Sequence, residues 1–291
     1  MSVYAIDGSK FTLPATETMR KEFDPESGLE HAGKGHYPHC LVSTLYDVFR
    51  RLPVDRTIVS IHGAERQEAL VLQRHVPKQS VLLFDRGSPS YDLFRLLTKA
   101  SRQFFIVRCP ATCTFPAVEA FVKSGKTEAT IWMTPSNKAV AKLTPRQRNK
   151  LKAIKVRGIL LHHPDGTVSV VIRNVFNRCL FPREDSIDLY FRRWTVENYD
   201  KDEQVTLRIE TFQSYTPHGI RQELFAAMMM TVIARTLMIV ATNTYVQEHQ
   251  RCQFEHAILT LAQEAALLVP ENPAQALVIF TELLQEIARV T

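Results

Sequence analysis

A short apolar run that ends at residue 85 constrains the fold more than any other feature of this 291-residue sequence. The segment Ser80-Val-Leu-Leu-Phe-Asp85 shows no polar alternation, and Arg86-Gly87 ends it. A continuous run of this length is typical of a strand that is buried on both faces of a sheet. Both faces of such a strand have to be covered, so we expect a layered α/β protein.

Strand and helix patterns alternate around this run. Apolar, β-branched segments predict an antiparallel start to the sheet over residues 3–13, 40–48 and 57–61, and a further strand over 103–108. Helical spacing of apolar residues covers 65–75 and 91–100. The order is three strands, a helix, a strand, a helix and a strand, which predicts a mixed sheet with helices against it.

The second half of the chain follows other patterns. Two apolar runs, 157–161 and 168–173, flank the turn signal Pro164-Asp165-Gly166 and predict a β-hairpin. After residue 183 the chain is helical, and the helices are predicted over about 187–204, 219–247, 254–268 and 273–290.

Charge is distributed unevenly along the chain. Residues 248–291 carry two basic and six acidic side chains, a net charge of −4. Because the whole chain has a net charge of +6, the first 247 residues have a net charge of +10. Eight Lys or Arg and no acid fall between Lys138 and Arg157. A basic body favours a polyanionic partner, whereas the acidic C-terminal region argues against such a contact there. A solvated helix face would explain the basic run equally well.

Cysteine content and hydropathy exclude two further classes of protein. Five cysteines in a chain of this length form no disulfide framework and indicate a reducing compartment. The N-terminal residues lack the pattern of a signal peptide. The most apolar stretch, 225–234, is too short to span a bilayer, so we expect it to be a buried helix and expect no membrane association.

Acidic side chains stand at two unusual places, because Asp7 lies in an apolar strand and Asp85 at the end of another. Carboxylates are costly to bury and need a partner, for which a divalent cation is one choice. A structural hydrogen bond or a turn cap is the simpler interpretation of each residue. Mg²⁺ prefers oxygen ligands, and two such ions can clamp the attacking and leaving oxygens in phosphoryl transfer.

One face of the helix predicted after residue 187 is polar. Steps of three, four, four and three residues place its members on one side. They are Tyr190, Arg193, Glu197, Lys201 and Gln204. The stripe is either a solvated ladder of ion pairs or a surface for a phosphodiester, which the planar guanidinium of Arg193 could bind through two hydrogen bonds.

Three acidic segments occur in a fixed order: Ala5-Ile-Asp-Gly-Ser9, Leu83-Phe-Asp-Arg-Gly87 and Tyr190-Phe-Arg-Arg-Trp-Thr-Val-Glu197. Together they resemble the motifs of DDE transposases encoded by bacterial insertion sequences, in the group whose third motif reads Y-x2-R-x3-E-x6-K. The resemblance extends to Arg66 and to the segment from Thr216 to Glu223.

The resemblance implies a ribonuclease-H-like mixed sheet with a β-rich insertion and C-terminal helices. Its catalytic domain would comprise residues 1–110 and 183–247, interrupted by the insertion at 111–182 and followed by a helical region at 248–291. Asp7, Asp85 and Glu197 would be catalytic and would hold two Mg²⁺ ions, for which Mn²⁺ could substitute. DNA contacts would come from Tyr190, Arg193, Lys201, Arg86, Lys142, Arg146, Arg148, Lys150 and Lys152.

The implied activity is hydrolysis at the element ends, followed by attack of a 3′-hydroxyl on target DNA. Double-stranded DNA would be the partner, as transposon ends and target, and the enzyme would form a homodimer on it. The enzyme would be located in the cytoplasm, in association with the nucleoid.

The sequence departs from the family pattern at two points. Gln204 stands where the motif has Lys, which weakens one expected phosphate contact. Asp7 comes without the N-terminal region that relatives usually carry, so we expect a chain that begins at its catalytic domain, as a gene remnant or as one product of a split gene. Two alternatives stay open: a catalytically idle DNA-binding or partner-binding remnant, and a nuclease of the same fold without strand transfer.

Overall fold

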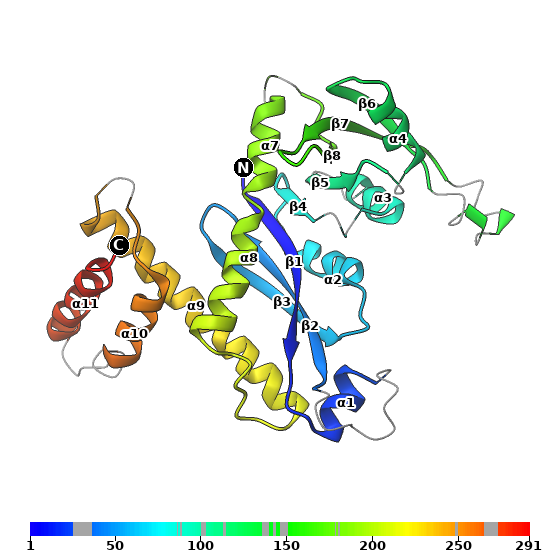
Figure 1. The fold of residues 1–291 in the computed structure, drawn as a ribbon. Coiled ribbons are helices and arrows are strands. Elements are labelled where there is room, and N and C mark those ends of the chain that lie inside the picture. Colours follow the sequence, from blue (N-terminus) through cyan, green and yellow to red (C-terminus); the bar gives the residue numbers. More distant parts are fainter. Residues whose placement is uncertain are drawn as a thin grey trace.

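The structure is a computed structural model, and it describes most of the chain. The described residues are 1–25, 37–85, 87, 89–99, 103–112, 115–135, 140–141, 144–145, 151–177, 179, 181–247, 250–264 and 273–291. Within them a mixed sheet of eight strands forms the centre (Figure 1). Its strands are β1 (Val3–Thr12), β2 (His39–Asp47), β3 (Leu52–Ser60), β4 (Val81–Phe84), β5 (Phe104–Pro110), β6 (Glu128–Met133), β7 (Ile154–His162) and β8 (Val168–Arg173).

The strand order is β3-β2-β1-β4-β5-β8-β7-β6. Strands β1, β2 and β3 pair antiparallel, as the sequence predicts, whereas β4 and β5 run parallel to β1. The apolar run before Asp85 is β4, and all four of its residues are buried. Leu82 and Phe84 pack into one hydrophobic cluster while Val81 and Leu83 pack into another, so this strand is covered on both faces as predicted.

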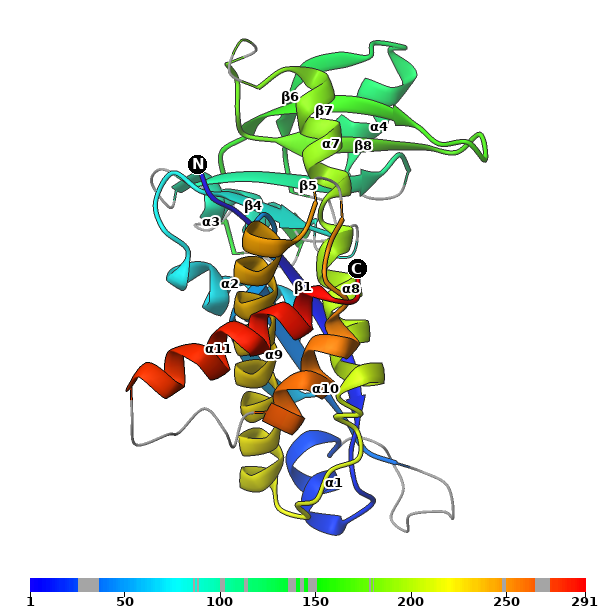
Figure 2. The same ribbon diagram turned by 90° about the vertical axis from the view of Figure 1, so that its left-hand side faces the viewer.

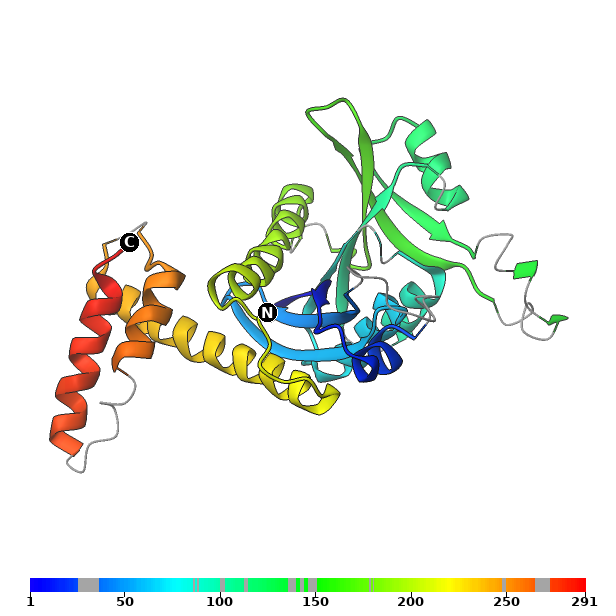
Figure 3. The same ribbon diagram turned by 60° about the horizontal axis from the view of Figure 1, so that its bottom comes forward.

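Helices cover both faces of the sheet and extend beyond it. They are α1 (Glu17–Phe23), α2 (Glu65–Leu72), η1 (Gln73–His75), α3 (Tyr91–Lys99), α4 (Pro116–Lys123), α7 (Arg183–Phe191), α8 (Trp194–Lys201), the π-helical segment η2 (Asp202–Thr206), α9 (Pro217–Tyr245), α10 (Phe254–Glu264) and α11 (Pro273–Ala288). The first hydrophobic cluster takes side chains from α2, α3 and α4, and the second takes side chains from α7 and α8. The two groups of helices lie on opposite faces of the sheet (Figure 3).

The β-rich segment after residue 111 adds its strands to this same sheet. The predicted hairpin is β7–β8, and Gly166 in its turn has a φ of +80°, a conformation that glycine adopts without strain. β8 pairs antiparallel with β5, and Val156 and Leu160 on β7 share the first hydrophobic cluster with Leu82 on β4.

Helix α9 differs from its predicted environment. Residues 225–234 were expected to form a buried helix, but Phe225 and Met229 are 43% and 64% exposed. Within α9 an 18-residue window has a mean hydropathy of 2.0 and is only 22% buried. It is the one described helix that is long and apolar enough to cross a membrane, by length and composition alone. The C-terminal half of α9 packs on α10 and α11, which cross it (Figure 2), whereas Ile220 and Leu224 in its N-terminal half pack with Phe11 on β1.

Candidate active site

Strand geometry brings Asp7 and Asp85 to one face of the sheet. Side chains alternate along a strand, so Asp7 points to the same side as Ala5, and Asp85 continues the direction of Leu83. Ala5 and Leu83 are register partners on the parallel neighbours β1 and β4, and both belong to the cluster beneath α7 and α8. The two acids therefore lie on adjacent strands and face the same helices.

The polar helix predicted over 187–204 is not one continuous α-helix. It comprises α7, a turn at Arg192–Arg193, α8 and the π-helical segment η2. The amide of Arg193 donates to the Tyr190 carbonyl, three residues back, which tightens the chain at this turn. This local change turns Arg193 toward the sheet, where its side chain is 3% exposed.

The three acids named from the sequence meet at this arginine. The Arg193 guanidinium donates from Nη1 to Asp7 Oδ2 at 3.2 Å and from Nη2 to Glu197 Oε1 at 2.6 Å. Its Nη2 also lies 3.4 Å from Asp85 Oδ1. Carboxylates from β1, from the end of β4 and from α8 thus surround one buried cation.

Burial dominates the electrostatics of Asp7. Loss of solvation raises the pKa of Asp7 to about 6, although attraction to Arg193 and the amide of Gly8 oppose the rise. Repulsion from Asp85 and Glu197 adds to the increase. A cation near the cluster would relieve this repulsion, which is why such a group of acids favours a positively charged partner.

A second layer of polar groups holds the site, and sequence reasoning missed it. Ser9 on β1 donates to Asp200 Oδ2 on α8 at 2.6 Å, which ties the strand of Asp7 to the helix of Glu197. Burial raises the pKa of Asp200 to about 7. The available signal was spacing: Ser9 follows Asp7 by two residues on a strand, and Asp200 follows Glu197 by three on a helix.

A fully buried ion pair lies further along the same helix. Arg56 on β3 donates to Glu203 Oε2 at 2.7 Å, and both side chains are 0% exposed. The Tyr199 hydroxyl accepts a hydrogen bond from Arg56 and donates one to Glu203. Buried ion pairs with hydrogen bonds of this kind fix the position of a helix against a sheet, here that of α8 and η2 against β3.

The residues expected to contact DNA lie in different environments. Tyr190 is fully buried beside Arg193, so it reaches no surface in this conformation. Lys201 is exposed at the end of α8, one turn beyond Glu197, and Lys152 is exposed just before β7. Gln204 donates to the Lys10 carbonyl at 3.5 Å. The remaining expected contacts, Arg86, Lys142, Arg146, Arg148 and Lys150, lie outside the described residues.

The donor set fits a divalent cation in chemistry, because it consists of three carboxylates that already surround a positive group. The present geometry is not that of a metal centre. In the described part of the chain no three His, Cys, Asp or Glu side chains are placed to hold one ion. The carboxylates point at Arg193 instead of at a common centre, so this arginine would have to move before they could ligate a metal.

The mixed eight-stranded sheet with helices on both faces confirms the predicted α/β fold class, and its similarity to a solved transposase is consistent with a ribonuclease-H-like fold. The sequence matches the transposase DDE domain family over residues 1–233, and the chain belongs to this family. Its fold is similar to that of a piggyBac transposase in a synaptic complex with hairpin DNA, with a TM-score of 0.53 and 9% sequence identity. That match covers 97% of this chain and 57% of the other, so the chain spans little more than half of that protein. No curated protein matches the chain.

Proposed function

We propose that the chain is a DNA transposase that cleaves and joins DNA at insertion-sequence ends, with Asp7, Asp85 and Glu197 as its catalytic carboxylates. The convergence of these three acids on the buried Arg193 carries the proposal. They come from positions 7, 85 and 197 of the chain, and a purely structural ion pair would need only one of them. Membership of the transposase DDE domain family supports the same conclusion.

In this proposal Asp7, Asp85 and Glu197 hold divalent cations, either two Mg²⁺ ions or Mn²⁺ in their place. When bound, such ions polarise phosphoryl oxygens and make a bound water more acidic. The contribution of the chain is to hold the carboxylates on one side of the scissile phosphate through the Ser9–Asp200 contact. Once Arg193 leaves the carboxylates, its guanidinium can bind a phosphate oxygen next to the cluster.

The proposed partners are double-stranded DNA at the transposon ends and at the target, at the nucleoid in the cytoplasm. A homodimer on DNA is part of the proposal, and the apolar side chains that α9 and α11 expose support it. Met229 is 64% exposed on α9, and Leu277 is 66% exposed on α11. Light scattering of the chain with and without a DNA duplex tests this part, because a mass that stays monomeric on DNA would contradict it.

A nicking assay tests the catalytic proposal directly. The purified chain is incubated with element-end DNA and Mg²⁺ or Mn²⁺, alongside the Asp85→Asn and Asp92→Asn variants. Asp92 is the matched control, because it is an exposed acid on α3 that lies away from the cluster. We expect nicks from the wild type and from Asp92→Asn but none from Asp85→Asn. Equal nicking by all three proteins would exclude Asp85 from the chemistry, and joined products would separate a transposase from a plain nuclease.

A catalytically idle DNA-binding protein is the second candidate function. The observation in its favour is the present position of Arg193, which occupies the space among the carboxylates that a metal would need. Salt-sensitive DNA binding without any metal-dependent cleavage would support this candidate. Cleavage restored by an N-terminal fragment added in trans would contradict it.

A further inference from the structure

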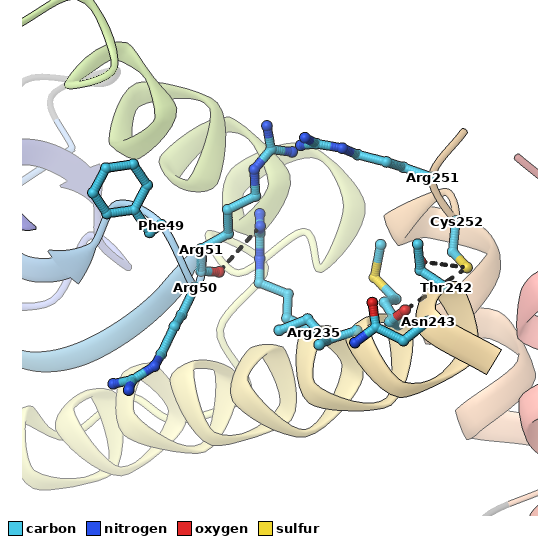
Figure 4. A pocket seen from close by; sticks show the side chains of 10 residues that line it. Phe49, Arg50, Arg51, Arg235, Thr242, Asn243, Arg251 and Cys252 are labelled. Carbon is cyan, nitrogen blue, oxygen red and sulfur yellow. Dashed lines mark hydrogen bonds between the residues drawn. The ribbon is translucent and has the colours of Figure 1, made fainter. Parts of the chain in front are cut away.

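A cavity of about 460 Å³ lies outside the carboxylate cluster, between the turn that joins β2 to β3 and the C-terminal half of α9 (Figure 4). We call it the arginine pocket, because Arg50, Arg51, Arg235 and Arg251 line it. Its apolar wall includes Met238 and Ile239 from α9, and no acidic residue is among the described residues that line it. Positive charge against an apolar wall strengthens the local field toward an anion.

Two of these arginines lack a carboxylate partner within the described ranges. Arg50 pairs with Asp47 at 3.5 Å and Arg235 with Asp202 at 2.5 Å, whereas Arg51 and Arg251 form no such pair there. Figure 4 shows the side chains of Arg51 and Arg251 extending toward one another across the mouth of the pocket. Partial burial and the charges of Arg251 and Arg235 lower the pKa of Arg51. An anion bound between the two guanidinium groups would remove this repulsion.

The backbone holds Arg51 in this position against its own preference. Its φ is +58°, in the left-handed region that residues other than glycine rarely adopt. The Arg235 guanidinium donates to the Arg51 carbonyl at 3.3 Å, and its ion pair with Asp202 anchors it to η2. The turn is thereby fixed to α9 and to the segment that follows the catalytic helix.

Phe49 connects the arginine pocket to the turn at Arg192–Arg193. Arg192 lies over the ring of Phe49, 5.7 Å from its centroid, and Phe49 lines the pocket. Arg192 is the neighbour of Arg193, whose guanidinium sits among the three acids. Arg192 also pairs with Asp188 at 2.9 Å, so the positive charge without a carboxylate partner in the described ranges beside Phe49, which is 55% exposed, is that of Arg51 and Arg251.

We propose that the arginine pocket binds the phosphodiester backbone of a DNA strand outside the catalytic cluster, with Arg51 and Arg251 each contacting a phosphate. Arg251 belongs to the acidic C-terminal region, for which the sequence argues against DNA contact, but the described residues that line the pocket include no acid. This inference rests on the proposed function for the identity of its ligand. Guanidinium groups suit phosphate oxygens because their planar N–H groups match two acceptors at once. The exposed ring of Phe49 supplies an apolar contact for a sugar or base beside those phosphates.

The test measures DNA binding without metal and compares three proteins. Fluorescence anisotropy of a labelled duplex in EDTA gives the dissociation constant over a salt series for the wild type, Arg51→Gln/Arg251→Gln and Arg95→Gln/Arg289→Gln. The last variant is the control, because it removes the same two charges from exposed residues on α3 and beyond α11. Each phosphate contact contributes about 0.9 to the magnitude of the slope of the logarithm of the association constant against the logarithm of the salt concentration. The slope of the pocket variant should therefore be smaller in magnitude than that of the wild type by about 1.8.

Over the range from about 50 to about 200 mM salt, this difference makes the advantage of the wild type over the pocket variant shrink about tenfold. If the control variant lost as much slope as the pocket variant, the lower net charge alone would explain the effect, and the proposal would be overturned. Saturable binding of inorganic phosphate by the wild type, together with an unchanged DNA slope in the pocket variant, would assign the pocket to a small anion and also overturn it.

Stability supplies a second readout. Removal of both repelling cations should leave the melting temperature of the DNA-free pocket variant equal to or above that of the wild type. If the double variant is unfolded, Arg251→Gln alone should lose about 0.9 in slope. The two proposals fail separately. If the pocket variant shows a smaller salt slope but the wild type never nicks DNA, the catalytic proposal is refuted. If the wild type nicks DNA but the pocket variant keeps the salt slope of the wild type, DNA binding by the arginine pocket is refuted.

Discussion

The raised pKa of Asp7 predicts that this acid destabilises the folded protein at neutral pH. The pKa of Asp7 rises from 3.8 to about 6 on folding, mainly through burial. Because one pKa unit corresponds to 1.36 kcal/mol, the full shift amounts to about 3 kcal/mol. The folded state then binds more protons than the unfolded state between these two pKa values, so stability falls as the pH rises through this window.

The perturbation that tests this reasoning is Asp7→Asn, which removes the titration and keeps a side chain of similar shape. We expect the unfolding free energy of the variant, relative to the wild type, to increase by about 2–3 kcal/mol between about pH 4 and about pH 8. Urea unfolding followed by circular dichroism in EDTA, at several pH values, measures the difference. A difference that is independent of pH, or that decreases as the pH rises, would refute the burial argument.

Asp165 provides a control of opposite sign. Hydrogen bonds from the Thr167 hydroxyl and amide lower the pKa of this exposed carboxyl. Its ionised form therefore stabilises the fold above the unfolded pKa, and that stability is lost as the pH falls through the lowered folded value. The relative stability of Asp165→Asn should accordingly decrease as the pH rises, opposite to the trend for Asp7→Asn.

Three further substitutions test the packing that positions the site. Arg56→Met leaves the buried Glu203 without its partner and should cost about 3–5 kcal/mol in a urea melt, and a double variant with Glu203→Met should recover part of this loss. Ser9→Ala removes the hydrogen bond to Asp200 and should cost about 1–3 kcal/mol, with faster hydrogen exchange in α8 than in α3. Leu83→Ala opens a cavity under the cluster and should lower the unfolding free energy by about 2–5 kcal/mol, which thermal denaturation would detect.

Much of the sheet could be predicted because local patterns are strong there. The run that ends before Asp85 has no polar residue to expose, so burial on both faces was the one arrangement that satisfied it. The hairpin around Gly166 followed from its turn residues. The environment of α9 could not be predicted in this way, since composition does not say which neighbours cover an apolar helix, and residues 225–234 proved to be half exposed.

The break in the helix predicted over residues 187–204 could not be predicted from the sequence either. Regular spacing predicted one polar face from Tyr190 to Gln204, but the chain tightens at Arg193. Tyr190 and Arg193 are buried on this face, while Lys201 stays in solvent. Packing against the sheet decided this outcome, because a local spacing rule contains no information about the surface that a helix meets.

The sequence by itself placed Asp7 within one apolar strand and Asp85 at the end of another, because runs of apolar, β-branched residues mark strands locally. Only the tertiary structure decided that Arg193 would stand among the three acids and that Arg51 would meet Arg251, 200 positions further along the chain. Contacts between distant segments depend on how strands pair and helices dock, and those choices are made by burial of the whole core. Periodicity therefore placed each acid on its element, and packing assembled the site.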